Sequence, residues 1–422
     1  MFSRTSPPSA IQPCPSPSPC KDAKAKDDAL TKAVAQRVQN LTGEKVVTQG
    51  TLPQDSGPSL IPGNWSPCQK LASSMGTTIR QFNRYSQALP SARAAFDMNR
   101  LDDEKDDKAK RNCLTMLSES AEELNVALGL PPGTLTDADL LNDKTGFRAA
   151  IYRSESDGRL ILVARDTQPH SLEDWKTNTD NGQGQDTAQY FAMRKLAGKL
   201  AKNDVSFDVA GYSKGGGLAQ EAGLMSPKSK IFVFNSAGLS DRSLERTGQK
   251  SFESLQSRTV SFSSEGDFLT YMNNTTDPAQ QISNARYLRN ELDGSFSPIE
   301  IEFRNPEMKA AEDGRHFWQA DVDPNFEKDK KDYLEGLDKM IAKAEDDRQA
   351  EHPFRLFPPV QASQHETIPN SMTKIGSLLG AKEDEANLGR LYQHKMDKVL
   401  DPMESLVKKD RELMENFLKQ CP

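Results

Sequence analysis

The chain has 422 residues, of which 35% are hydrophobic and 27% are charged, and its formal net charge is −7. The net negative charge and the lack of a dominant stripe of basic residues argue against a nucleic-acid partner. No apolar run reaches the roughly 20 residues that a membrane-spanning helix needs. The length suffices for one large or two modest domains, and the composition predicts a compact core with polar appendages.

The N-terminal region is rich in serine and proline, and residues 1–8 lack the apolar core of a Sec signal peptide. We predict a disordered leader over residues 1–64 with one short helix around residues 30–41. The five cysteines are scattered along the chain, at Cys14, Cys20, Cys68, Cys113 and Cys421. Their odd number and the lack of a C-x-x-C pair argue against a disulfide scaffold and against a zinc site, so no metal and no cofactor are expected.

Helical spacing of apolar residues begins at Cys68, and a second helix is expected near residues 106–129. These helices predict a helical segment over residues 65–144 that packs on the core. Beyond residue 325, further apolar stripes predict a helical C-terminal extension over residues 326–422. We expect the stripes to pack on the same protein, with a lid or a membrane-contact face as the alternative.

Between these helical regions the pattern changes to short apolar runs. Strands are expected at residues 147–153, 159–165, 231–234 and 259–262, with a hairpin turn at Asp157-Gly158 and a helix around residues 190–200. Strands that alternate with helices predict a mostly parallel sheet covered on both faces. The predicted fold class is therefore α/β, with a catalytic core over residues 145–325 and helical extensions on both sides.

The segment Phe207–Gln220 contains G-x-S-x-G around Ser213, between an apolar strand pattern and a helical pattern. This strand-turn-helix context is typical of a nucleophile elbow, although the motif by itself recurs by chance. Gly211 and Gly215 flank the serine, where the turn is so tight that side chains would clash. Ser213 is thus the candidate nucleophile.

A serine hydroxyl needs a base to remove its proton and an acid to orient that base. In elbow hydrolases the order along the chain is serine, acid, histidine. Asp267, in a loop after an expected strand, is the candidate acid, and Glu265 is the close alternative. His316 is the candidate base, because it lies beside two aromatic residues after a strand expected over residues 298–303. The other histidines lie at less suitable positions in the chain: His170, His352, His365 and His394.

The developing oxyanion requires two hydrogen-bond donors. The backbone N–H of Lys214, directly after the nucleophile at a helix N-terminus, is the first candidate. The second is expected from Arg165-Asp166-Thr167, where an earlier strand ends.

Four segments, taken in order, resemble the fungal-type (class three) lipases: Leu162–Thr167, Asp174–Asn178, Gly211–Gly217 and Phe234–Leu239. Those enzymes are α/β-hydrolases of acylglycerols and phospholipids, and their bacterial branch includes phospholipase-like toxins and effectors. The resemblance covers residues 145–320. It implies that Ser213 is the nucleophile, Asp267 the acid and His316 the base, with Thr167 as the oxyanion residue.

The chain departs from the family pattern at two positions beside the oxyanion hole. Asp166 replaces the glycine that precedes the oxyanion residue, and its charge would oppose the intermediate unless the side chain points away. Lys214 replaces the apolar residue that follows the serine. Its charge is expected either to hold an anionic lipid head group or to be solvated.

From these features we expect a phospholipase, A1-type, that works through a Ser-His-Asp triad and an acyl-enzyme on a lipid or membrane substrate. The expected setting is that of a secreted bacterial effector without a Sec signal, delivered by a type III or type VI-like system. A cognate immunity or chaperone protein is the expected protein partner. The alternatives are a cytoplasmic acylglycerol lipase and a catalytically inactive hydrolase fold used as a binding module, for which Asp166 is the argument.

Overall fold

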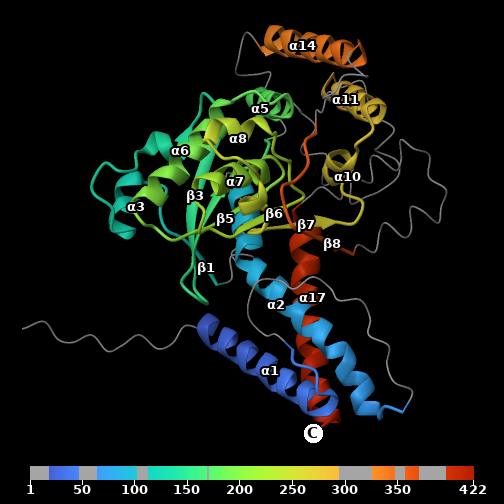
Figure 1. The fold of residues 1–422 in the computed structure, drawn as a ribbon. Coiled ribbons are helices and arrows are strands. Elements are labelled where there is room, and N and C mark those ends of the chain that lie inside the picture. Colours follow the sequence, from blue (N-terminus) through green and yellow to red (C-terminus); the bar gives the residue numbers. More distant parts are fainter. Residues whose placement is uncertain are drawn as a thin grey trace, which may run out of the picture.

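The computed structural model describes residues 19–46, 64–101, 113–168, 171–293, 326–346, 357–369 and 396–422. A mixed sheet lies at its centre, with strand order β1-β3-β4-β5-β6-β7-β8 and β2 paired to β3 (Figure 1). The strands are β1 Leu114–Met116, β2 Leu141–Asn142, β3 Phe147–Ser154, β4 Leu160–Ala164, β5 Asp208–Tyr212, β6 Ile231–Phe234, β7 Thr259–Ser264 and β8 Gln364–Ile368. The β3–β4 hairpin is antiparallel and β4 to β8 pair in parallel, which confirms the α/β class.

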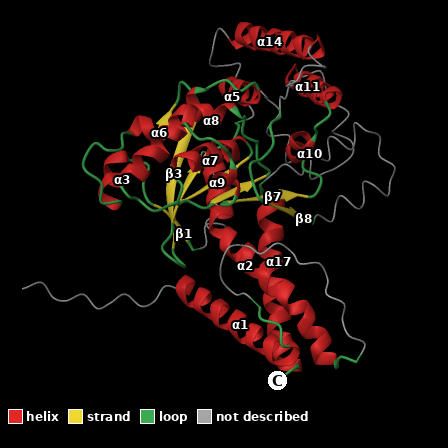
Figure 2. Cartoon of the chain, in the orientation of Figure 1, coloured by secondary structure: helices red, strands yellow, loops and turns green. Residues whose placement is uncertain are grey.

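Helices cover both faces of this sheet (Figure 2). Those on the N-terminal side of the elbow are α1 Pro19–Thr42, α2 Pro67–Asn99, α3 Ala121–Ala127, α4 Asp137–Leu140, α5 Leu172–Gly182 and α6 Ala188–Lys202. After it come α7 Lys214–Met225, α8 Arg242–Thr247, α9 Glu253–Gln256, α10 Phe268–Asn274, α11 Pro278–Asp293, α14 Phe326–Asp346 and α17 Asp397–Gln420.

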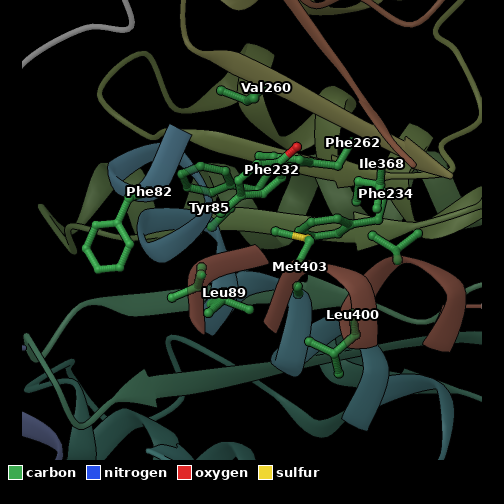
Figure 3. Packing of buried hydrophobic residues seen from close by; sticks show 14 of the residues in the cluster. Phe82, Tyr85, Leu89, Phe232, Phe234, Val260, Phe262, Ile368, Leu400 and Met403 are labelled. Atoms are coloured by element: carbon green, nitrogen blue, oxygen red, sulfur yellow. The ribbon is translucent and has the colours of Figure 1, made fainter. Parts of the chain in front are cut away.

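Successive side chains of each strand point to opposite faces of the sheet, so a separate hydrophobic core forms on each face. In β4, Ile161 and Val163 belong to the cluster packed under α2 and α17, whereas Leu162 and Ala164 belong to the cluster under α6 and α7. Aromatic side chains fill the first core, and Phe234 of β6 stacks on Phe262 of β7 with ring centroids 5.6 Å apart. Figure 3 shows these rings packed against residues of α2 and α17. The two layers fix the sheet, so the carboxyl ends of β4 to β8 share one rigid edge.

A helical arm, which we define as α1, the first half of α2 and the second half of α17, extends from the core (Figure 1). Disulfides join Cys20 to Cys113 and Cys68 to Cys421, and thereby tie this arm to the core and its helices to one another. The sequence argument against disulfides is therefore wrong. Cys14 lies outside the described residues.

Two further sequence expectations differ from the structure. In the leader expected over residues 1–64, with one short helix around residues 30–41, α1 spans Pro19–Thr42. Within the helix expected near residues 106–129, Leu114–Met116 is a strand paired to β3, and the helix α3 begins at Ala121 behind its N-cap Ser120. The strand expected over residues 298–303 lies outside the described residues. By contrast, the helix expected from Cys68 is present as α2, which begins at Pro67 behind a capping box formed by Ser66 and Gln69.

Candidate active site

Ser213 occupies a strained turn between β5 and α7. Its backbone has φ 51° and ψ −124°, a conformation that non-glycine residues rarely adopt. The Ser213 N–H donates to the Phe234 carbonyl oxygen at 3.0 Å, and the Ser213 carbonyl accepts from the Ala237 N–H at 2.8 Å. Such strain persists only where the surroundings enforce it, as these bonds to the end of β6 do.

The glycines around Ser213 are required because neighbouring atoms leave no room for a Cβ. A Cβ on Gly211 would overlap the backbone of Gly215, and a Cβ on Gly215 would lie 2.5 Å from the Ala164 carbonyl oxygen. A Cβ on Gly216 would overlap the Ser236 side chain. The glycines therefore let α7 start directly against the ends of β4, β5 and β6, as the motif predicted.

Asp267 lies at the same edge of the sheet, three residues after β7. It is 2% exposed and caps α10, because its Oδ2 accepts from the Thr270 N–H at 2.7 Å. The turn before it is fixed by Asn235, whose amide bonds both the N–H of Ser264 at 2.9 Å and the hydroxyl of Ser264 at 3.0 Å. Glu265, the alternative acid, is only half-buried. The structure thus places Asp267 and Ser213 at the same carboxyl edge of the sheet, after strands that are separated by β6 alone.

The loop after β4 holds the other oxyanion candidate. The Thr167 hydroxyl accepts from the Asn178 amide of α5 at 2.9 Å. The Asp166 N–H donates to the Asn99 side chain at the end of α2 at 3.1 Å. The Asp166 carboxylate accepts from the Gln168 amide at 3.2 Å, so part of its charge is offset within the loop.

Lys214 does not meet lipid or solvent. Its side chain is 1% exposed and its Nζ forms an ion pair with the Asp174 carboxylate of α5, which is itself fully buried. Burial lowers the pKa of Lys214, and the neighbouring Asp174 opposes that effect. Both sequence expectations for this side chain, a head-group ligand and a solvated charge, are wrong.

The base cannot be assigned by position, because His316 lies outside the described residues, as do His170, His352 and His394. The described histidine is His365, on edge strand β8, where it pairs in register with Ser261. Its side chain reaches the surface, and the protein packed around it lowers its pKa by desolvation. Three strand spacings separate β8 from β5, about 14 Å, so His365 is too far away to receive the Ser213 proton.

Helix α14 lies above α5 and α11 in the view of Figure 1. The Tyr333 hydroxyl of α14 donates to the Trp175 carbonyl oxygen of α5 at 3.2 Å. On the other side, Asp338 of α14 accepts from Arg289 of α11 at 2.9 Å. Since α5 follows β4 and α11 lies beyond β7, α14 connects the two flanks of the site. A lid or membrane-contact role for it stays a prediction.

Within the described residues, no group of three or more His, Cys, Asp and Glu side chains is arranged to hold a metal ion. In the same part of the chain, no helix has both the length and the apolar character required to cross a bilayer.

Comparison with known proteins adds one finding to this geometry. Residues 106–297 match the family model of a Tle-like phospholipase domain, a span that includes Ser213, Asp267 and Thr167 but ends before His316. No curated protein matches the chain. The matched region contains the elbow and the candidate acid, so this part of the chain is similar to a phospholipase domain.

Proposed function

We propose that this protein is a serine esterase that hydrolyses a carboxyl ester of phospholipids, with A1-type specificity. The observation that carries the proposal is the strained elbow at Ser213, within the span that matches a phospholipase domain. A serine held at such a turn exposes its hydroxyl above the sheet and places a helix N-terminus beside the reacting carbonyl.

In the proposed reaction, Ser213 Oγ attacks the ester carbonyl while a histidine takes its proton. The backbone N–H of Lys214 and the Thr167 group stabilise the oxyanion, and Asp267 orients the histidine. The histidine then protonates the departing lysophospholipid alcohol, which leaves an acyl-enzyme. Water, deprotonated by the same histidine, releases the fatty acid and restores Ser213.

Two histidines compete for the role of base. His316 follows from the lipase resemblance. His394 is the other candidate, because it lies two residues before Met396, which is buried in the hydrophobic cluster that also contains residues of β6 and β7. The lipase resemblance favours His316.

Single alanine variants of the two histidines separate them. The variant that lacks the base should lose about three orders of magnitude or more in kcat, whereas the other should keep near-normal kcat. Full activity in both variants would contradict a histidine base from either position.

The main test follows hydrolysis of phospholipids with distinguishable acyl chains at the two glycerol positions. Wild type should release the sn-1 chain, and Ser213→Ala should lower turnover by about three to six orders of magnitude. A fluorophosphonate probe should label wild type at Ser213. Absence of both turnover and labelling would instead support the inactive binding module, for which the charge of Asp166 beside the oxyanion loop is the argument. Release of the sn-2 chain alone would refute the A1 assignment.

We also propose that the protein acts as a secreted effector. Two disulfides support function in an oxidising compartment, because such bonds are rare in proteins that stay in a reducing cytosol. Production directed to the bacterial periplasm should arrest growth, whereas cytosolic production should be tolerated. Toxicity confined to the cytosol would refute this assignment.

A further inference from the structure

We propose that Asp174 is a positioning residue for the oxyanion hole, and that its buried carboxylate holds the two halves of the hole at a fixed separation. One half is the start of α7 at Lys214, and the other is the loop at Thr167 and Gln168. The inference rests on the proposed function, because it concerns the same hydrolytic site.

Asp174 contacts both halves directly. Its Oδ1 pairs with Lys214 Nζ and accepts from Gln189 Nε2 of α6 at 2.6 Å. Its Oδ2 accepts from the Gln168 N–H at 2.8 Å. One carboxylate therefore joins the elbow helix, the loop after β4 and α6, with each oxygen assigned to a different side of the hole.

The carboxylate is itself held in place by α5. The Asp174 N–H donates to the N-cap hydroxyl of Ser171 at 3.2 Å, which fixes the first turn of the helix. One turn later, Asn178 lies on the same face and donates to the Thr167 hydroxyl at 2.9 Å. Helix α5 thus contacts the loop twice: its Asp174 carboxylate accepts from the Gln168 backbone N–H, and its Asn178 amide donates to the Thr167 hydroxyl.

A purely structural role makes a different prediction from a positioning role. Buried ion pairs can commonly be replaced by apolar residues of similar volume without loss of stability. An apolar pair, however, cannot accept a hydrogen bond from the Gln168 N–H or attract the start of α7. If the Asp174–Lys214 pair positions the oxyanion hole, the apolar replacement should still fold but should have a lower kcat.

The test compares wild type with the double variant Asp174→Leu/Lys214→Met, with p-nitrophenyl butyrate as substrate. We expect kcat to fall about 100-fold with KM changed by less than about threefold, because the donors and not the binding surface are displaced. A second double variant, Asp174→Asn/Lys214→Met, keeps an oxygen that can accept from the Gln168 N–H. Its kcat should be about tenfold higher than that of Asp174→Leu/Lys214→Met.

A matched control removes another buried ion pair of α7, that of Glu221 with Arg194 of α6 at 2.5 Å, through Arg194→Met/Glu221→Gln. Its thermal midpoint should shift, but kcat should remain within about threefold of wild type. Should Asp174→Leu/Lys214→Met fail to fold, Asp174→Asn/Lys214→Met decides the question by its own kcat, which should lie about tenfold below wild type.

Wild-type kcat in a folded variant at Asp174 and Lys214 would overturn the inference alone. So would an equal loss of kcat in the control, since any buried pair of α7 would then have the same effect. A wild type whose hydrolysis does not depend on Ser213, shown by Ser213→Ala measured in parallel, would overturn the proposed function and this inference together.

Discussion

Asp27 of α1 and Arg411 of α17 form a two-bond ion pair, at 2.7 and 2.8 Å, across 384 residues of sequence. Nearby, Arg37 donates to the Cys421 carbonyl oxygen at 2.7 Å. Within the described part of the chain, the earliest and the latest helices are therefore packed together, and the arm is a defined unit of the fold.

The Cys68–Cys421 disulfide should contribute strongly to stability, because it closes a loop across 353 residues. We expect Cys68→Ser/Cys421→Ser to lower the free energy of unfolding by about 2–5 kcal/mol, measured by urea denaturation under oxidising conditions. Reductant should bring wild type towards the variant. Cys14→Ser is the control, because neither disulfide uses that residue, and an unchanged midpoint in the double variant would contradict the expectation.

Asp267 and Glu265 can be separated by conservative amide variants. Asp267→Asn should lower kcat by about four orders of magnitude, because an amide cannot stabilise the charged base, while asparagine still caps α10 and preserves the fold. Glu265→Gln, at the half-buried alternative acid, should keep near-normal kcat. Thermal midpoints measured alongside establish folding, and the reverse pattern of kcat would make Glu265 the acid.

Gly215 should tolerate no side chain. Gly215→Ala places a Cβ 2.5 Å from the Ala164 carbonyl oxygen, so α7 must shift away from β4. We expect a loss of about 2–4 kcal/mol in stability and of fluorophosphonate labelling at Ser213. The matched control is Gly336→Ala in α14, where a Cβ meets nothing within 4 Å. That change should be neutral or stabilise the protein by less than about 1 kcal/mol. A Gly215→Ala protein as stable as Gly336→Ala would contradict the close approach.

Asp410 of α17 should make stability fall as pH rises. Burial raises its pKa to about 6, and within the described residues its Oδ2 has no hydrogen-bond partner. The folded protein therefore keeps a proton that the unfolded chain releases near pH 4, so stability decreases from about pH 4 to pH 6 and stays lower above that.

Asp410→Asn should remove this dependence. At pH 8 the variant should be more stable than wild type by on the order of 1–2 kcal/mol, and near pH 4 the two should coincide. Urea unfolding at both pH values measures the difference. A variant that is less stable at pH 8 would show that the Asp410 carboxylate has a stabilising partner.

The parts of the fold that follow from local physics could be predicted from the sequence. The β3–β4 hairpin follows from Asp157-Gly158, and the elbow follows from glycines that only a backbone contact explains. The strand β6 was predicted at its observed residues because its apolar run is short and bounded by polar residues.

Features that depend on partners distant in sequence could not be predicted. The position of Lys214 next to the nucleophile suggests that its charge binds an anionic ligand. The structure instead pairs Lys214 with Asp174, which lies 40 residues earlier in the sequence. The cysteine pairs join positions 93 and 353 residues apart, which spacing alone cannot reveal. Strand β8 has few apolar residues, since it lies at the sheet edge, and its sequence resembles a linker.

Helix α2 connects the tip of the helical arm to the loop that holds the oxyanion candidate Thr167. Its first turn is cross-linked to Cys421, and at its last residue the Asn99 side chain accepts from the Asp166 N–H in the oxyanion loop. At 1.5 Å per residue the helix is about 50 Å long, and it contains Pro90, a residue at which helices commonly bend. The position of that loop therefore depends on a helix whose other end is fixed by the Cys68–Cys421 disulfide.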